Sequence, residues 1–285
     1  MRFAITVTDR YLGIFESLIE HGWTALKVFT SVVDGRIHHH TAAIEFARRL
    51  NVEVQISRLT QQNLQELAQR GCATLVVASY RWRIGDWRPH LQHAVNFHPS
   101  PLPRGRGPNP VPAAILEQAG TWGVSCHKLE HEFDSGDILK SSEFPLSVQE
   151  DYDGLDLRIQ LAARGLSADV ADHFEEYWNR ATPQGSGSYY PMWTLKDRTL
   201  DFSCTVDQVL RRLRAFGPLQ CLARLNNTNF FVRRAVGWTE SHRTPPGTVV
   251  YINSLAMVVA AADGFIGLTD WSLIEPGTVT GTARS

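Results

Sequence analysis

The chain has 285 residues, enough for one large domain or for a catalytic domain with an appendage. Apolar residues make up 43% and charged residues 20%, a balance that excludes a disordered or fibrous chain. The formal net charge is −1, and residues 201–285 carry eight Lys/Arg against six Asp/Glu. Neither part of the chain therefore has the positive excess typical of a nucleic-acid-binding protein.

The predicted elements alternate between strands and helices from the N-terminus onward. Strands are expected over 2–7, 26–29, 52–56, 73–78 and 94–97, and helices over 12–19, 42–50 and 64–68. The continuous apolar run Ala73–Ala78 is typical of a strand that is buried on both faces of a parallel sheet. The alternation predicts an α/β domain with a doubly wound, Rossmann-like parallel sheet.

The next segment is predicted to complete that domain. A helix is expected over 113–118, strands over 123–129 and 138–144, and one long helix over 155–178. Residues 182–190 have the small, polar composition of a linker. A helix over 206–215 and short strands over 230–233, 247–252, 255–260 and 264–268 then predict a small barrel. We therefore expect a catalytic domain over 1–182, a linker over 183–199 and a C-terminal domain over 200–285.

Three further features bear on compartment. The longest apolar run, Leu255–Ala262, has eight residues, whereas a membrane-spanning helix needs about 20, so no membrane association is expected. The N-terminal residues do not follow the pattern of a secretion signal. The four cysteines are widely spaced and form no CxxC pair, which argues against a disulfide framework and a zinc knuckle. These features predict a cytoplasmic protein.

Polar side chains gather where the fifth predicted strand ends. Asn96 and His98 lie two residues apart, so they point to the same side of that strand. An amide donor beside an imidazole suits the stabilisation of an oxyanion and the transfer of a proton. Asp134, in a turn before the next strand, is the best candidate for a carboxylate that orients the histidine. The residues alone leave two other interpretations open: a hydrogen-bonded strand end for Asn96 and His98, and turn formation for Asp134 and Asp137.

Three motifs then appear in a fixed order. They are NFHPSPLP (96–103) followed by Arg106-Gly107, GVSCH (123–127) and FDSGDIL (133–139). In sequence and spacing they resemble the folate-dependent formyltransferase family, which includes methionyl-tRNA, glycinamide ribonucleotide and amino-sugar N-formyltransferases. LDF (200–202), LRAFGP (213–218), PGTV (246–249) and DG (263–264) resemble the C-terminal appendage of the longer members. The resemblance implies that the C-terminal barrel is OB-like.

The resemblance implies transfer of the formyl group of 10-formyltetrahydrofolate to an amine, without a metal. Asn96 would donate a hydrogen bond to the oxygen of the tetrahedral intermediate. His98, held at least partly protonated by nearby negative charge, would stabilise that oxygen and protonate the departing folate nitrogen. Asp134 would raise the pKa of His98 and relay the proton of the amine through water.

The resemblance also places a folate pocket between two loops. The predicted folate-binding residues are Tyr80, Arg81, Trp82, Glu130, His131, Glu132 and Phe133. Backbone groups usually bind the pterin in this family, and the segment Tyr80–Arg83 is bulkier than is usual there.

The acceptor amine is predicted from the charge of the chain and from one short segment. A short segment after the second strand and the near-neutral charge favour a small-molecule amine, such as a nucleotide-linked amino sugar or hydroxyornithine, over methionyl-tRNA. A 10-formyltetrahydrofolate hydrolase would use the same three residues and consume the folate without an amine. A single-stranded nucleic-acid-binding protein would need aromatic residues on a basic barrel face, and here the charge excess is weak.

A homodimer is a further expectation. His38–His40 is interpreted as a loop or an acceptor contact, because three consecutive histidines do not converge on one metal ion.

Overall fold

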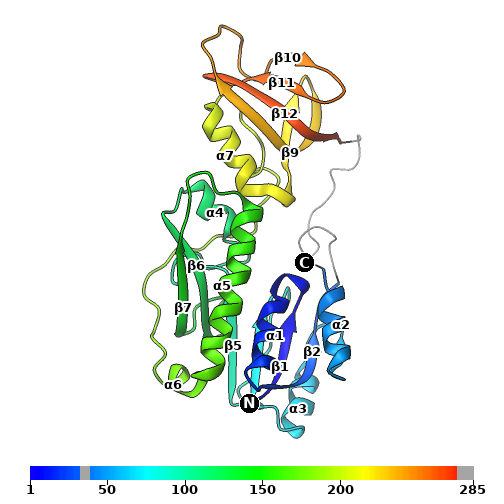
Figure 1. Ribbon diagram of the computed structural model, residues 1–285, viewed down its shortest axis with the longest axis vertical. Helices are drawn as coiled ribbons and strands as arrows, with labels where there is room; N and C mark the ends of the chain where they lie inside the picture. The colour runs from blue at the N-terminus through cyan, green and yellow to red at the C-terminus, as the bar shows by residue number, and fades with distance from the viewer. Residues whose placement is uncertain (33–38, 275–285) are drawn as a thin grey trace. The chain divides into compact units, whose positions relative to one another are not determined.

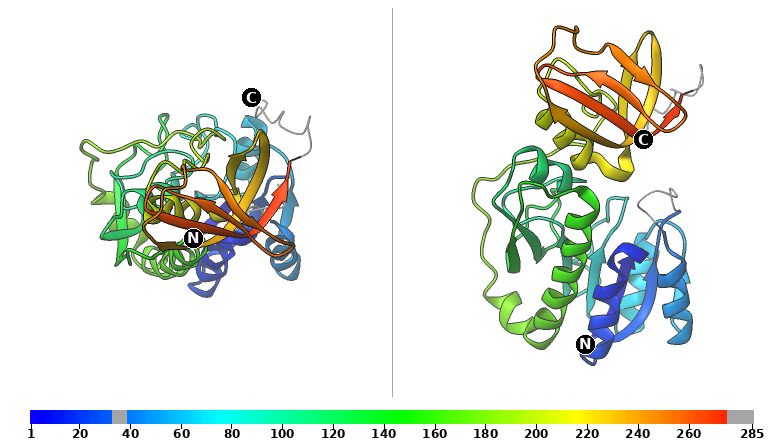
Figure 2. Two further views of the ribbon diagram at one scale, coloured as in Figure 1. Left: turned by 90° about the horizontal axis from the view of Figure 1, so that it is seen from above. Right: turned by 45° about the horizontal axis from the view of Figure 1, so that its top comes forward.

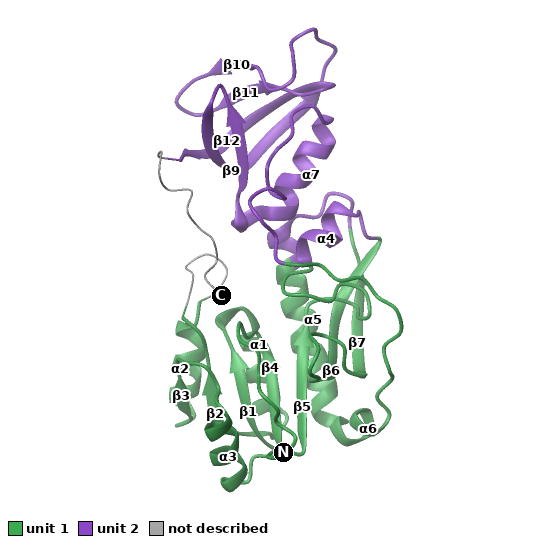
Figure 3. Cartoon of the chain, turned by 180° about the vertical axis from the view of Figure 1, so that it is seen from behind, with its two compact units in different colours: residues 1–110, 120–146, 156–191 green, residues 111–119, 147–155, 192–285 purple. Residues whose placement is uncertain are grey.

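The computed structural model describes residues 1–32 and 39–274, which form two compact units (Figures 1 and 3). Unit 1 comprises residues 1–110, 120–146 and 156–191, and unit 2 comprises 111–119, 147–155 and the residues from 192 onward. The chain therefore enters unit 2 twice by short excursions before it passes into the C-terminal region.

Unit 1 is built on a seven-stranded sheet in the order β3-β2-β1-β4-β5-β6-β7. Its strands are β1 (Arg2–Val7), β2 (Thr24–Phe29), β3 (Glu53–Gln55), β4 (Thr74–Ala78), β5 (His93–His98), β6 (Thr121–Lys128) and β7 (Ile138–Pro145). Strands β1 to β5 pair in parallel. The strand order reverses between β1 and β4, the arrangement that opens a crevice at the carboxyl ends of the strands. The prediction of a Rossmann-like α/β sheet is confirmed in this part.

The helices of unit 1 cover both faces of the sheet. They are η1 (Asp9–Tyr11), α1 (Leu12–Glu20), α2 (Thr41–Arg49), α3 (Gln61–Gln69), residues 156–172 of α5 (Tyr152–Asp172) and α6 (Phe174–Asn179). Phe3 of β1 packs against Phe15 of α1, with the ring centroids 6.1 Å apart. The next residue, Ala4, points the other way, into a buried cluster with Leu64 of α3. Arg164 of α5 forms ion pairs with α1, beside which α5 lies in Figure 1.

The expected parallel sheet is antiparallel at one edge. Strand β6 pairs antiparallel with β5, and β7 pairs antiparallel with β6. A parallel β6 would require a connection that returns the chain along the whole of β5. The helix in that connection, α4 (Val111–Leu116), has only six residues, about 9 Å, which is shorter than β5. The chain therefore re-enters the sheet at the end where β5 leaves it.

The single long helix expected over 155–178 is also wrong, because α5 and α6 are separate helices. The break lies at His173, whose backbone leaves the helical region (φ −123°, ψ 23°). After the break, Phe174 and Trp178 pack on the buried ring of His93, with centroids 5.1 and 4.6 Å away. The change of direction thus covers the first residue of β5 with aromatic rings.

Unit 2 contains a five-stranded antiparallel sheet in the order β10-β11-β12-β9-β8. Its elements are α4, α7 (Val206–Phe216), η2 (Gly217–Leu219), β8 (Cys221–Leu225), β9 (Thr228–Thr239), β10 (Val249–Ile252), β11 (Met257–Ala260) and β12 (Gly264–Leu273). Strand β8 is absent from the sequence-based expectation. In the described part of the chain no pairing joins the edge strands β10 and β8, so the closed barrel stays a prediction.

Helix α7 lies beside this sheet (Figure 2), and hydrogen bonds hold its N-terminus. The Thr205 side chain accepts a hydrogen bond from the backbone N–H of Gln208, and the N–H of Val206 donates to Asp263 Oδ1 at 2.8 Å. These bonds satisfy two of the N–H groups that a helix start leaves unpaired. A Cβ at Gly237 of β9 would lie 2.7 Å from the Val206 side chain. The absence of a side chain at Gly237 therefore lets the helix approach the sheet closely.

Candidate active site

The predicted pair Asn96 and His98 lies on β5, at the carboxyl end of the parallel strands. The pair points to the same side as Ala94, which is part of the core cluster beneath α3. His98 is buried and Asn96 is half-buried. The core therefore holds the base of this strand rigidly, while its last residues carry the polar groups.

Asp134 lies beside both of these side chains. Its Oδ1 is 3.3 Å from Nδ1 of His98 and accepts a hydrogen bond of 3.3 Å from Nδ2 of Asn96. Its Oδ2 accepts a hydrogen bond of 2.9 Å from the backbone N–H of Gly107. The side chain of Asp134 is only 10% exposed. The structure thus brings together the three residues that the sequence predicts as catalytic, although 36 residues separate the strand end from the carboxylate.

A fourth side chain, His127, completes this cluster and is missing from the predicted site residues. His127 is the β6 partner of Asn96 in the strand register, and its Nε2 is 3.1 Å from Asn96 Nδ2. Its Nδ1 is 2.8 Å from the backbone oxygen of Lys128, an acceptor. The arrangement assigns the ring proton to Nδ1 and makes Nε2 the acceptor for Asn96. The signal in the sequence is the histidine that ends the GVSCH motif.

The charge of Asp134 is set by opposing effects. Burial raises its pKa, because a buried carboxylate loses hydration. The His98 imidazole and the N–H of Gly107 act in the other direction, and the pKa is lowered to about 2. Asp134 is therefore a fixed negative charge at neutral pH.

The charge of His98 differs from the expectation of a partly protonated ring. Burial lowers the pKa of His98, and the opposing effects of Asp134 and the Gly105 carbonyl do not outweigh it. The resting ring is thus neutral near pH 7. Its Nε2 is 2.8 Å from the Gly105 oxygen and its Nδ1 faces Asp134, so both nitrogens face acceptors. A neutral ring can donate to only one of them, and uptake of a proton lets His98 donate to both.

Both N–H groups of Asn96 are engaged within the cluster. One points to His127 Nε2 at 3.1 Å and the other to Asp134 Oδ1 at 3.3 Å. The second bond is the longer of the two, beyond the usual range for N–H···O contacts. A substrate oxygen that accepts from Asn96 must therefore replace a bond of the resting site, and the bond to Asp134 is the weaker one.

The first predicted folate loop follows β4 and uses its aromatic side chains internally. Ser79 turns the chain with a left-handed backbone (φ 86°). The N–H of Leu59 donates to the Tyr80 hydroxyl at 2.6 Å. The Trp82 ring lies 5.3 Å from that of Tyr80, and the Arg81 guanidinium lies 5.7 Å from the Trp82 ring. Tyr80 is thus anchored in the protein, and Arg81 is exposed.

The second predicted loop lies against the same segment of chain. All four of its predicted residues are exposed: Glu130, His131, Glu132 and Phe133. Arg83 lies 3.0 Å from His131 Nδ1 and 5.7 Å from the Phe133 ring, and Arg88 forms an ion pair with Glu130. The two loops are therefore neighbours, as the folate interpretation requires. The structure does not bring their side chains into contact with Asn96 or His98 through any hydrogen bond among the described residues.

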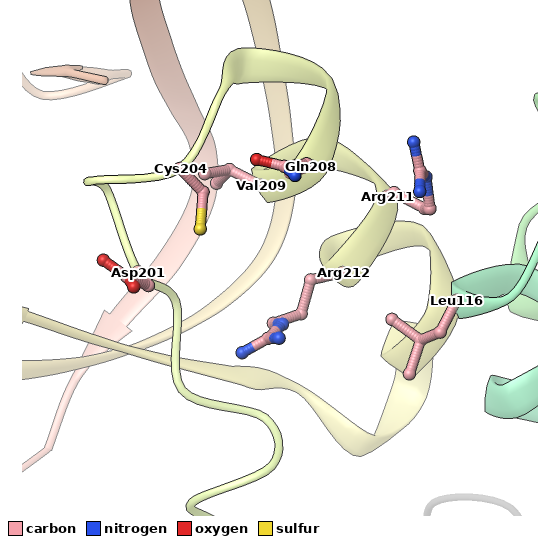
Figure 4. Close-up of a pocket in the computed structure, with 7 residues that line it drawn as sticks. All are labelled: Leu116, Asp201, Cys204, Gln208, Val209, Arg211 and Arg212. Atoms are coloured by element: carbon pink, nitrogen blue, oxygen red, sulfur yellow. The ribbon is translucent and has the colours of Figure 1, made fainter. Parts of the chain in front are cut away.

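Two other features lie outside this cluster. His40 Nδ1 is 2.8 Å from the Ser31 oxygen, whereas His38 lies outside the described residues. A cavity of about 270 Å³ in unit 2 contains none of the predicted site residues (Figure 4). It is lined by Leu116, Asp201, Cys204, Gln208, Val209, Arg211 and Arg212. Within 1–32 and 39–274, no group of His, Cys, Asp and Glu side chains is arranged to bind a metal ion.

Comparison with known families agrees with the motifs and the geometry. Residues 34–168 match the family model described as formyl transferase, and residues 194–280 match the one described as formyl transferase, C-terminal domain. The chain belongs to the folate-dependent formyltransferase family. The resemblance that the sequence motifs indicate is thereby confirmed, and both parts of the chain share it.

Individual family members are similar over different lengths. A methionyl-tRNA formyltransferase of Treponema denticola is 36% identical over 126 residues, which cover 44% of this chain and 39% of that protein. Across three methionyl-tRNA formyltransferases, the chain spans 39% to 58% of their length.

Two solved structures share the fold over almost the whole chain. HypX from Aquifex aeolicus, in complex with tetrahydrofolic acid, has a TM-score of 0.66 at 19% identity, covering 95% of this chain and 44% of that one. The N-formyltransferase of Helicobacter canadensis, in complex with folinic acid and dTDP-3-aminofucose, has a TM-score of 0.68 at 16% identity. That match covers 94% of this chain and 98% of the other, and at such identities the likeness establishes the fold.

Proposed function

We propose that this chain transfers the formyl group of 10-formyltetrahydrofolate to the amine of a small acceptor, such as a nucleotide-linked amino sugar or hydroxyornithine. The observation that carries the proposal is the cluster of Asn96, His98 and Asp134 at the carboxyl end of β5. It combines a fixed carboxylate with an amide donor and a buried neutral imidazole, each 3.3 Å from the same carboxylate oxygen. Family membership supplies the reaction class to which these groups are suited.

The folate supplies the formyl group, and the acceptor amine attacks its carbon. A new C–N bond forms, the bond to the folate nitrogen breaks, and one proton moves from the amine to that nitrogen. Asn96 exchanges its long bond to Asp134 for one to the carbonyl oxygen, where negative charge develops. His98 takes up the proton because Asp134 and the Gly105 carbonyl stabilise its charged form, and it returns the proton to the leaving nitrogen.

The two neighbouring loops fit a flat, hydrogen-bonding ring such as a pterin. The exposed Phe133 ring and the half-buried Trp82 ring offer apolar contacts. The Tyr80 hydroxyl is engaged with the N–H of Leu59. Recognition of the ring by this loop is therefore assigned to backbone groups and to Trp82. We assign binding of the folate to residues 80–82 and 130–133.

The small acceptor is favoured by the weak charge of the chain and by the sugar N-formyltransferases that share its fold. Methionyl-tRNA is the second candidate, because the curated relatives are methionyl-tRNA formyltransferases. The two acceptors differ in one measurable property. A tRNA-binding protein neutralises several phosphates, so its affinity falls steeply with salt, whereas a nucleotide sugar offers only two.

We also propose the domain boundaries 1–182 and 200–285, an OB-like closure of the C-terminal sheet, a homodimer and a cytoplasmic location. All four cysteines are free, which is compatible with a reducing compartment. Among the described residues, no helix has the length and apolar character needed to cross a membrane.

The test is turnover of 10-formyltetrahydrofolate, followed by the absorbance of the tetrahydrofolate that forms, across a panel of amines. The panel contains UDP- and dTDP-linked amino sugars, hydroxyornithine and charged initiator tRNA, with His98→Ala as the control. Turnover with one small amine, abolished in the variant, would establish the proposal. Turnover with charged tRNA and with no small amine would make methionyl-tRNA the acceptor in place of a small molecule. Turnover without any amine would make the protein a hydrolase. Failure to bind the folate would refute the proposal.

A further inference from the structure

Residues 182–190 form an ordered strap along the candidate active site. Thr182 and Ile138 exchange backbone hydrogen bonds of 2.8 and 2.9 Å. Farther along, the Ser188 hydroxyl accepts from the N–H of Gly105 at 2.9 Å, and the Ser188 carbonyl accepts from the N–H of Arg106 at 3.0 Å. The N–H of Tyr190 then donates to the Arg106 carbonyl at 2.8 Å. The strap is thus paired with the 105–107 turn, which binds the Asp134 carboxylate, and with the first residue of β7, which follows the Asp134 loop.

One side chain of the strap, Gln184, joins these two segments. Its Nε2 donates to the backbone oxygens of Asp134 and Gly136, at 2.9 and 2.6 Å. Its Oε1 accepts from Nε and from one terminal nitrogen of Arg106, at 3.0 and 2.8 Å. The amide therefore uses both donors and both lone pairs, which is the full capacity of a glutamine.

The bonds of Gln184 fall where the Asp134 loop most needs support. Asp134 has a left-handed backbone (φ 55°), which residues other than glycine adopt less readily, although aspartate tolerates it better than most, so contacts with neighbours help to hold it. Its carboxylate is held on the other side by the N–H of Gly107, the residue after Arg106. Gln184 thus binds the Asp134 backbone and the turn that binds the Asp134 side chain.

We propose that Gln184 is a positioning residue, which sets the place of the Asp134 carboxylate beside His98 and so the proton affinity of His98. The kinetic part of this inference rests on the proposed formyl transfer, and the part that concerns His98 does not. Gln184 touches neither His98 nor Asn96 by any hydrogen bond in the described structure, so it acts through Asp134 and Arg106.

The strap is also held in place by close backbone packing. A Cβ at Gly187 would overlap the carbonyl oxygen of Pro103, and a Cβ at Gly107 would overlap that of Tyr190. Gly185, in the same strap, has no atom within 4 Å of the place where its Cβ would lie. Neither Gly185 nor Gly187 has a positive φ that would itself strain an alanine. The two glycines therefore offer a matched pair. An alanine at 187 has to displace the strap from Pro103, whereas an alanine at 185 meets no atom and leaves the strap in place.

The experiment uses the full chain with Gln184→Met, which keeps the length of the side chain and removes all four hydrogen bonds. Gly187→Ala displaces the strap by a different route, and Gly185→Ala is the control. Each protein is measured in three ways: NMR titration of the His98 ring, assigned with a His98→Asn variant, the pH profile of kcat and KM, and thermal unfolding. The His98 titration needs neither substrate nor activity.

In Gln184→Met and Gly187→Ala, the carboxylate is expected to move away from His98. Its negative charge then raises the pKa of His98 less, while burial still lowers it, so the ring titrates at lower pH than in the wild type. We expect kcat to fall about 10- to 100-fold, as for a displaced catalytic group, with KM for the folate little changed. Gly185→Ala should match the wild type in every measurement. An unchanged His98 titration in folded Gln184→Met would overturn the proposal, whatever happens to kcat. A shifted titration in a protein that transfers no formyl group to any amine would retain the positioning role and reject the proposed function.

Discussion

The fixed charge of Asp134 yields the sharpest quantitative prediction. Its pKa is about 2, against an ordinary value of 3.8. This difference corresponds to about 2 kcal/mol by which the folded state favours the ionised carboxylate, and at 10% exposure solvent screens little of it. Asp134→Asn removes the ionised form. We therefore expect the variant to lose about 2 kcal/mol of unfolding free energy at pH 7, or about 4–8 °C in Tm.

The dependence on pH gives the sign of the effect. Because the folded pKa lies below the unfolded one, the ionised carboxylate stabilises the protein fully above about pH 4. This contribution is lost as the pH falls from there through about 2. The difference between wild type and Asp134→Asn should thus be constant from pH 7 to 5 and shrink below pH 4. Urea unfolding of both proteins at several pH values measures it.

Asp137→Asn is the matched control, because it makes the same chemical change in the same loop. Asp137 is 39% exposed and pairs with Lys128 at 3.3 Å. A surface ion pair of this kind contributes less than about 1 kcal/mol to the free energy of unfolding. The explanation fails if both variants lose the same stability, or if the loss in Asp134→Asn does not change with pH. The His98 ring should also titrate at lower pH in Asp134→Asn, since the opposing charge is gone.

Three further outcomes follow from the geometry. Asn96→Ala should lower the single-turnover rate of formyl transfer about 100- to 1000-fold, the usual loss for an oxyanion donor, without weakening folate binding in a fluorescence titration. Gly136→Ala should lower Tm and kcat together, because its Cβ would overlap the carbonyl oxygen of Lys128, whereas Gly120→Ala, which has no neighbour within 4 Å, should change neither. Arg88→Ala removes the exposed ion pair with Glu130, which lies in a loop proposed to bind the folate, so KM for the folate should rise in steady-state assays while Tm stays within about 2 °C.

The sequence predicts the parts of the site that depend on short-range periodicity. Asn96 and His98 could be placed together because residues two apart on a strand share a face. Their position at the carboxyl end of a parallel strand followed from the alternation of strands and helices. Asp134 required the family motif as well, because an aspartate in a turn is more often a turn-former than a catalytic group.

Long-range contacts account for what the sequence could not predict. The antiparallel β6 brings His127 beside Asn96, and nothing in the local pattern of 121–128 gives the direction of that strand. Gln184 lies 50 residues from Asp134 in a segment with linker composition, so its four hydrogen bonds are visible only in three dimensions. The neutral state of His98 results from burial by the whole domain, which outweighs the carboxylate that suggested a protonated ring.

In the proposed formyl transfer, the strongest interactions of the resting cluster become available only in the transition state. Asn96 already uses both N–H groups, and the bond it must give up, to Asp134, is 3.3 Å long. A neutral formyl oxygen gains little by replacing that bond, whereas an oxygen that acquires negative charge accepts a shorter, charge-assisted one. His98 follows the same logic, since both of its nitrogens face acceptors and only the protonated ring can donate to both. In the proposed mechanism each group therefore binds more tightly as charge develops, which is the differential binding that lowers an activation barrier.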